Sequence, residues 1–250
     1  MTATLILQAD APPLGADDGR PLAVVEAMER GMPGLRLAWK IGAEGRLIPA
    51  TQGDKRVIAR TRDGGFALYC NGDMQRLVTM TAREVPSALC PGGRPQLFIN
   101  AKWPVDEAGL GAASDTLESV AEAAGSYWAH VTPESVVVEV ADQVSGTPSP
   151  GLQTSPRGLP MLRQGSELRS PDIPRHLGWL NYWSAAAARA IGFPDPACDA
   201  ELLSRSRRTE SGGWIVRLTD APLDLDNPAH LQALLRAYEH FPVIGGRVPA

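Results

Sequence analysis

Three aspartates near the C-terminal end of the sequence have the clearest potential for chemistry. Asp220, Asp224 and Asp226 follow an expected strand over residues 214–218 and precede an expected helix over residues 228–240. Carboxylates at a strand end can hold Mg²⁺ or Mn²⁺ for phosphoryl or glycosyl transfer, and Asp-x-Asp is a spacing that such sites use. One reading of the chain is therefore a metal-dependent hydrolase or transferase.

The same aspartates also have a purely structural interpretation, which their neighbours favour. Asn227 followed by Pro228 is a typical helix start, with Asn as the N-cap and Pro in the first turn. Asp226 then lies beside the positive end of the helix dipole, and Asp220 and Asp224 become turn residues. We therefore expect a protein that is not an enzyme and that needs no metal or other cofactor.

Other residue types that commonly carry catalysis show no arrangement typical of a site. The four histidines lack zinc-ligand spacing, and His130 and His240 are expected near helix C-termini, where a partly cationic imidazole meets the negative end of the dipole. The three cysteines are far apart and form no Cys-x-x-Cys pair, which argues against a disulfide framework or a zinc knuckle. Nucleophilic catalysis therefore has no identifiable centre.

The charge balance excludes some classes of partner. The chain has 24 basic and 28 acidic side chains and a net charge of −4. Its hydrophobic fraction of 44% is typical of folded globular proteins. Phosphate binding needs a concentrated basic stripe, whereas the densest basic run, at residues 205–208, is flanked by Glu201 and Glu210. No segment approaches the ~20 apolar residues that cross a bilayer, and the N-terminus lacks the basic start of a signal peptide. We expect a cytoplasmic protein that contacts neither nucleic acid nor a membrane directly.

Some residues are instead candidates for contact with another protein. Trp103 stands between Lys102 and Pro104 at an expected strand end, which makes it the tryptophan best suited to partial exposure and to the role of an interface hot spot. Core or simple edge packing is nevertheless the favoured interpretation for Trp103, and most of the six tryptophans are expected in the core. Acidic loop residues would meet a basic partner, because charge complementarity speeds association. The candidate partner-binding residues are Asp17, Asp18, Trp103, Asp106, Glu107, Asp220, Asp224 and Asp226.

The elements that must position these residues predict an α+β fold with a largely antiparallel sheet and helices packed on one side. Strands dominate the first third of the chain, helices and strands mix afterwards, and strict βαβ alternation is missing. Asn71-Gly72 is the clearest hairpin signal. Strands are expected over residues 4–9, 35–41, 57–60, 66–70, 77–81, 97–101, 177–183 and 214–218, and helices over residues 21–30, 114–128, 184–191 and 228–240.

Three segments need closer argument. The helix over residues 114–128 has Ser114 or Asp115 as its expected N-cap. Residues 132–134 are typical of another helix start, although the valine run that follows is also compatible with a strand. The Pro-, Gly- and Ser-rich stretch 144–174 is expected to be a long ordered surface loop within a single domain that comprises all 250 residues.

Four stretches of the C-terminal third carry a resemblance to a known family. They cover residues 177–184, 191–195, 208–226 and 230–247, and are rich in Trp, Tyr, Gly and Pro at element boundaries. Together they resemble the immunity protein 52 family of bacterial polymorphic-toxin and type VI secretion systems. The resemblance is specific over residues 177–247 and extends loosely over nearly the whole chain.

The resemblance implies a single α+β domain that binds and neutralises a cognate toxin and so protects the producing cell. The implied partner is a toxin effector protein, typically a DNase of restriction-endonuclease fold encoded next door. The matched motifs are of a kind that defines the fold, so they carry over no binding residues. A pre-folded, mildly acidic protein suits this role, because it must associate quickly with a basic nuclease. Occlusion of the toxin's active site and a block of its assembly remain alternative mechanisms.

Overall fold

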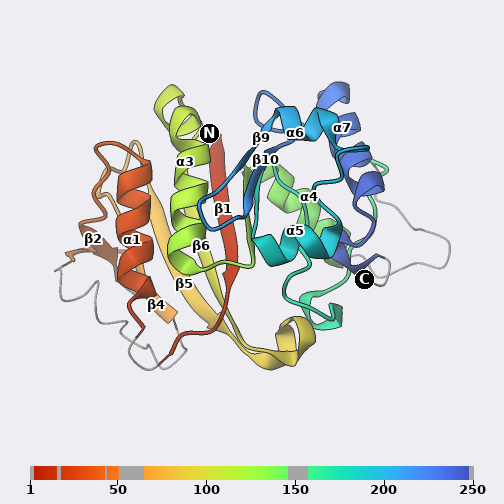
Figure 1. Cartoon of the computed structure of the whole chain (residues 1–250). Coiled ribbons are helices and arrows are strands. Elements are labelled where there is room, and N and C mark those ends of the chain that lie inside the picture. Colours follow the sequence, from red (N-terminus) through yellow and green to blue (C-terminus); the bar gives the residue numbers. More distant parts are fainter. Residues whose placement is uncertain (1–2, 16–17, 43, 51–64, 146–156, 248–250) are drawn as a thin grey trace.

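The protein is built around one large antiparallel sheet. The computed structural model describes residues 3–15, 18–42, 44–50, 65–145 and 157–247. Within these ranges ten strands form a single sheet in the order β3-β2-β4-β5-β6-β1-β7-β8-β10-β9, with β1 at its centre (Figure 1). All of the strand pairs are antiparallel. The expected α+β class with an antiparallel sheet is confirmed.

The elements have the following bounds. The strands are β1 (Thr4–Ala11), β2 (Trp39–Ile41), β3 (Leu47–Pro49), β4 (Gly65–Cys70), β5 (Thr79–Val85), β6 (Gln96–Pro104), β7 (Trp128–Pro133), β8 (Leu180–Trp183), β9 (Ser206–Arg208) and β10 (Trp214–Arg217). The helices are α1 (Arg20–Gly31), α3 (Glu107–Ala124), α4 (Glu134–Ser145), α5 (Ala185–Ile191), α6 (Ala200–Ser204) and α7 (Pro228–His240). None of the helices in the described ranges is long and apolar enough to span a membrane.

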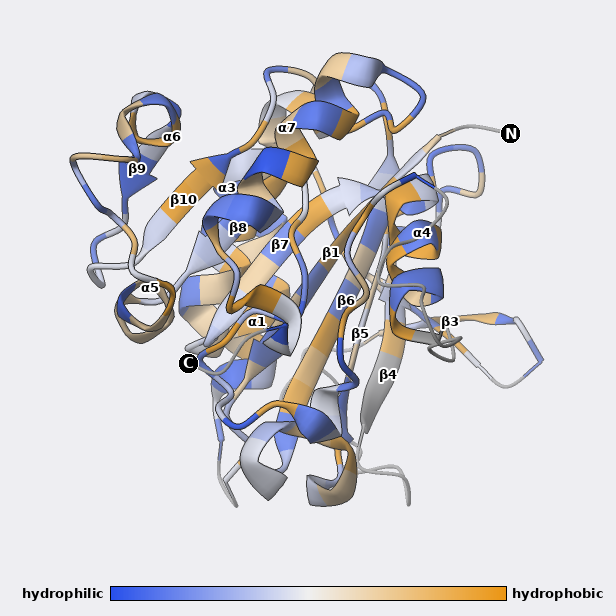
Figure 2. Cartoon of the chain, turned by 90° about the vertical axis from the view of Figure 1, so that its right-hand side faces the viewer, coloured by the Kyte–Doolittle hydropathy of each residue, from blue (hydrophilic) through white to orange (hydrophobic). Residues whose placement is uncertain are grey.

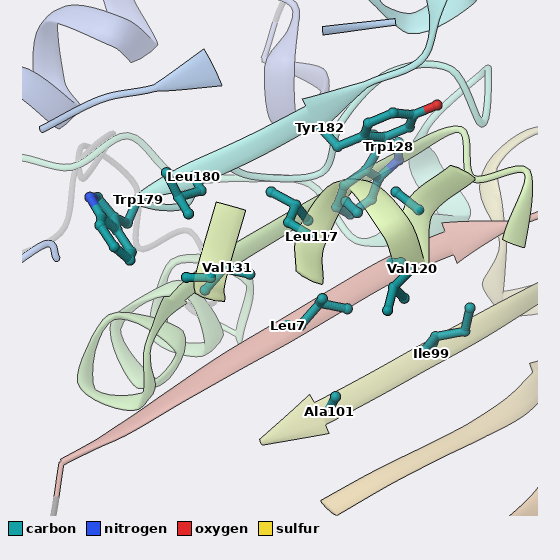
Figure 3. Close-up of a cluster of buried hydrophobic side chains, with 14 of the residues drawn as sticks. Leu7, Ile99, Ala101, Leu117, Val120, Trp128, Val131, Trp179, Leu180 and Tyr182 are labelled. Atoms are coloured by element: carbon teal, nitrogen blue, oxygen red, sulfur yellow. The ribbon is translucent and has the colours of Figure 1, made fainter. Parts of the chain in front are cut away.

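The first face of the sheet is covered by α1 and α3, which lie side by side across it (Figure 1). Side chains alternate between the faces of a strand, so Leu5 and Leu7 of β1 share this face with Val131, the register partner of Leu7 on β7. Leu117 and Val120 of α3 pack down onto it (Figure 3). All five side chains are fully buried, and burial of each contributes about 1.5–3 kcal/mol.

The second face is covered by residues from the C-terminal third. Trp183 of β8 meets the rings of Phe193 and Phe241 edge to face, at 5.1 and 5.3 Å between centroids. Phe241 directly follows α7, a helix that mixes hydrophilic and hydrophobic residues as a surface helix does (Figure 2). The predicted helices on one side of the sheet are α1 and α3. The other face is covered by the chain around α7.

Helix α3 differs from the prediction in its bounds. It starts at Glu107, because the side chain of Asp106 accepts a hydrogen bond from the backbone N–H of Gly109 at 2.8 Å and so caps the first turn. It ends at Ala124, since Gly125 adopts the left-handed conformation with a φ of 60°. The expected helix is thus confirmed over residues 114–124, whereas the expected N-cap at Ser114 or Asp115 is wrong, and residue 128 belongs to β7.

Most other expected elements are present with shorter or shifted bounds. The expected strands over residues 35–41 and 177–183 are reduced to β2 and β8, and residues 57–60 lie outside the described residues. Residues from Glu134 onward form a helix, which settles the choice between helix and strand. In the stretch 144–174, the chain is helical as far as Ser145, and residues 146–156 lie outside the described residues.

The close approach of α1 and α3 depends on a glycine. A Cβ atom at Gly31 would lie 2.6 Å from Cα of Thr116, in the backbone of α3, whereas a Cβ at Gly111 would meet nothing within 4 Å. We expect Gly31→Ala to lower the free energy of unfolding by about 1–3 kcal/mol, because the helices must move apart. The control Gly111→Ala should raise it by up to about 1 kcal/mol through helix propensity. Urea unfolding of both variants tests this, and equal stabilities would contradict it.

Candidate partner-binding site

A pocket opens on the first face, where the end of α1 meets the start of α3. Its volume is about 640 Å³. Residues 30–35 form one wall, the start of α3 from Asp106 onward forms another, and the loop between β4 and β5 closes it. The pocket lining includes Trp103 and Asp106, so the structure brings two of the expected partner-binding residues together here.

The loop between β4 and β5 is held in place by its own side chains. Asn71 Oδ1 accepts a hydrogen bond from the N–H of Val78 at 3.1 Å, and Asp73 Oδ1 accepts one from the N–H of Gln75 at 2.9 Å. Arg76 reaches across to Asp106, with its Nε 3.1 Å from Oδ2. The predicted hairpin is confirmed, although residues 71–78 form a longer connection than a two-residue turn. The loop is thus fixed to α3 before any partner arrives.

Trp103 is buried, with 1% of its surface exposed, so the favoured interpretation of core packing is confirmed and the role of an exposed hot spot is wrong. It points into the first face because its register partner on β1 is Leu5, which faces the core. Its indole Nε1 donates a hydrogen bond to the carbonyl of Gly109 at 3.1 Å. The ring forms part of the pocket wall and also supports the first turn of α3.

Asp106 and Glu107 lie at the N-terminal end of α3. The hydrogen bond from the N–H of Gly109, together with Arg76, keeps the pKa of Asp106 below its ordinary value. Asp106 is therefore ionised at neutral pH, and it serves both as helix cap and as anchor for the pocket loop. Glu107 occupies the first helical turn and is exposed.

Asp18 lies at the opposite end of the helix pair. Its carboxylate binds the guanidinium of Arg20, which also donates hydrogen bonds to the carbonyls of Pro12, Pro13 and Ala124. The hydrogen bond from Arg20 holds the pKa of Asp18 well below its ordinary value. The 18 residues of α3 give it a length of about 27 Å, and Ala124 is its last residue, so Asp18 lies at the far end of α3 from Asp106. Asp17 lies outside the described residues.

The aspartates before α7 form a third, separate group. Asp220 and Asp226 are exposed and pair with different arginines, Arg205 at 3.9 Å and Arg157 at 2.9 Å. Asp224 Oδ1 accepts a hydrogen bond from the N–H of Asp226 at 3.0 Å. The side chain of Asn227 caps α7, as the helix-start interpretation predicts. In the described part of the chain, no three His, Cys, Asp or Glu side chains are grouped so that they could hold a metal ion.

A buried polar cluster on the second face was not expected from the sequence. Asp10 of β1 is 1% exposed, and its carboxylate accepts a short hydrogen bond from Nη2 of Arg175. His130 lies on β7, not near a helix C-terminus, and its Nε2 is 3.2 Å from Nε2 of His176. The ring of Trp128 packs against His130, His176 and the guanidinium of Arg175. One signal in the sequence could have predicted this cluster. Asp10 follows the apolar residues of a buried strand, and a buried charge needs a partner of opposite charge.

The electrostatics of this cluster keep both histidines neutral. Burial, followed by the charge of Arg175, lowers the pKa of His130 to about 3. The pKa of His176 is also well below its ordinary value, through burial, His130 and Arg175. With neutral rings, one histidine donates the hydrogen bond and the other accepts it. Burial raises the pKa of Asp10 despite the attraction of Arg175.

Comparison with known proteins places the chain in a family. The model of the family described as "Domain of unknown function (DUF5953)" matches residues 16–249. The chain belongs to the DUF5953 family. Among curated proteins, none matches this sequence.

The fold of this DUF5953 protein is similar to that of a solved structure described as "Pseudomonas aeruginosa T6SS protein PA0821". The two share 14% sequence identity at a TM-score of 0.57, over 96% of this chain and 76% of that one. At this identity the likeness concerns the fold. The resemblance of residues 177–247 to the immunity protein 52 family stays a prediction.

The histidine pair of this DUF5953 protein predicts a loss of stability in acid. The unfolded chain protonates His130 near pH 6.5 and the folded protein only near pH 3, so between these values the unfolded state binds more protons. The contribution of His130 to the free energy of unfolding is complete above pH 6.5. It falls as the pH drops and is about 2 kcal/mol smaller at pH 5. Asp10 acts in the opposite direction, so a variant is needed to isolate His130.

Urea unfolding of wild type and His130→Leu at pH 7.5 and pH 5 makes this measurement. For each protein, the free energy of unfolding at pH 5 is subtracted from that at pH 7.5. This difference should be about 2 kcal/mol smaller in the variant than in wild type, whatever the absolute stability of the variant. His230→Leu is the matched control, because His230 lies in the first turn of α7, outside the cluster. An unchanged difference in His130→Leu would contradict the assignment.

Proposed function

We propose that this protein is an immunity protein, which binds and neutralises a cognate toxin and so protects the cell that makes it. The toxin is an effector of a type VI secretion system, and we propose a nuclease of restriction-endonuclease fold. The observation that carries the proposal is the likeness of fold, over 96% of this chain, to a protein described as a T6SS protein. The resemblance of residues 177–247 to the immunity protein 52 family supports the same role.

The arrangement of the acidic residues supports binding in preference to catalysis. Asp18, Asp106 and Asp226 are each engaged by an arginine of this chain, so these carboxylates organise the surface. Catalytic carboxylates would instead converge on a shared point where a reacting group could sit. A rigid surface also suits an inhibitor, because little conformational entropy is lost when it binds. On this proposal the protein acts in the cytoplasm, where the DNA that it protects is located.

The test is protection of a bacterial host that expresses the product of the neighbouring toxin reading frame. Co-expression of wild-type protein should restore viability, and both proteins should leave a size-exclusion column in one stoichiometric peak. A frameshifted copy of the gene is the control and should not protect. If the host dies despite normal levels of this protein, and the two proteins elute apart, the immunity function is wrong for that pair.

A further inference from the structure

Three polar side chains meet on the second face of the sheet, where Arg175 reaches the buried Asp10. Nη2 of Arg175 donates a hydrogen bond to Oδ1 of Asp10 and lies 3.3 Å from Oε1 of Gln96. Asp10 and Gln96 share this face, because Gln96 is two residues from Phe98, the register partner of Asp10 on β6. One nitrogen atom of Arg175 therefore brings a carboxylate and an amide together in the interior.

Each of these three groups has a second polar atom that lacks a protein partner. Oδ2 of Asp10, Nε2 of Gln96 and Nε of Arg175 are shielded from solvent, and none of them forms a hydrogen bond within the described part of the chain. Asp10 and Gln96 are 1% and 0% exposed. Folded proteins pair nearly all of their buried polar atoms, because an unpaired one is strongly unfavourable. Three such atoms around one contact indicate a bound ligand that pairs them.

The charges of the cluster favour a neutral ligand. An anion would meet the carboxylate of Asp10, and a cation would meet the guanidinium of Arg175. The ring of Trp128 closes one side of the cluster, with its centroid 5.8 Å from Cζ of Arg175, so the ligand is also small. The side chain of Arg175 is 24% exposed and leaves a route from the surface.

The hydrogen-bonding types of the three atoms identify the ligand. The N–H groups of Arg175 Nε and Gln96 Nε2 need an acceptor, whereas Oδ2 of Asp10 needs a donor. Water is small and neutral, and it both accepts and donates hydrogen bonds. A buried water molecule typically makes about three hydrogen bonds, which is the number that this cluster offers.

We propose that one water molecule is bound here, where it accepts hydrogen bonds from Arg175 Nε and Gln96 Nε2 and donates one to Asp10 Oδ2. The water links β1, β6 and the segment around Arg175, in addition to the direct contacts of Nη2. The inference concerns the interior of the folded protein and does not depend on the proposed immunity function.

Direct pairing is the alternative arrangement. A rotation of the guanidinium would bring Nε of Arg175 against Oδ2 of Asp10 and make the contact bidentate, as arginine–carboxylate pairs often are. No water would then lie between these two atoms. The test must therefore detect the water beside Arg175 itself.

Nuclear magnetic resonance of the full-length wild-type protein in water makes this test. A rotating-frame Overhauser experiment detects a water that stays bound beside an N–H group, and the sign of the cross-peak separates bound water from proton exchange. We expect such cross-peaks at Arg175 Nε–H and at the side-chain amide of Gln96. Asn181 is the matched control, because its amide is also buried but has both its polar atoms bonded to Gly178, at 2.9 and 3.0 Å.

A crystal structure that shows ordered waters is the second measurement. It should contain a water within hydrogen-bond distance of Arg175 Nε, Gln96 Nε2 and Asp10 Oδ2. Loss of the cross-peaks at both Arg175 and Gln96, or a direct contact between Arg175 Nε and Asp10 Oδ2 in the crystal, would overturn the water site. Equal cross-peaks at Asn181 would overturn it too, because the signal would not be specific to the cluster.

Discussion

A buried carboxylate at the centre of the sheet is the constraint on which the second half of the structure depends. Asp10 lies in the central strand and is shielded from water, and an unpaired charge there would cost several kcal/mol. The chain therefore has to bring Arg175 to the second face. The residues that follow Arg175 then attach the C-terminal elements, because Leu177 donates its N–H to the hydroxyl of Tyr238 on α7, and the indole of Trp179 bonds a carbonyl beyond β10. The ion pair is thus one of the contacts that hold the C-terminal elements against the second face, together with these hydrogen bonds and the aromatic packing of Trp183.

The first face follows a different physical principle. Its order comes from the close packing of α1 on α3 (Figure 1) over the apolar side of β1 and β7. Gly31 at the contact allows the two helices to approach closely, and the same residue lines the pocket. Stability and a candidate binding surface therefore arise from the same residues. The apolar face holds the helices together, and Asp106 both starts α3 and fixes the loop that closes the pocket.

Much of the fold could be predicted because its signals are local. Asn227 before Pro228 marks the start of α7 within two residues, and the apolar run of β1 identifies a buried strand. The start of α3 was missed because Gly109 and Gly111 weaken the helical signal in its first turns, so the cap at Asp106 was overlooked. The Asp10 cluster depends on Arg175, which lies 165 residues further along the sequence, and local sequence patterns cannot predict a contact between such distant residues. Of the candidate partner-binding residues, Trp103 and Asp106 lie together at the start of α3, whereas the pocket that they line is formed by three elements that are far apart in the sequence.

The central claim is that the protein neutralises a toxin by binding it, and a titration of inhibition tests this most directly. Purified wild-type protein is added in steps to a fixed amount of the purified proposed toxin, and cleavage of DNA is followed. The account predicts that activity falls in proportion to the added protein and disappears at one equivalent, since each molecule occupies one toxin. Undiminished cleavage in the presence of excess protein would contradict the immunity function. Complete inhibition by a small fraction of an equivalent would contradict the binding mechanism, because it would require catalytic turnover.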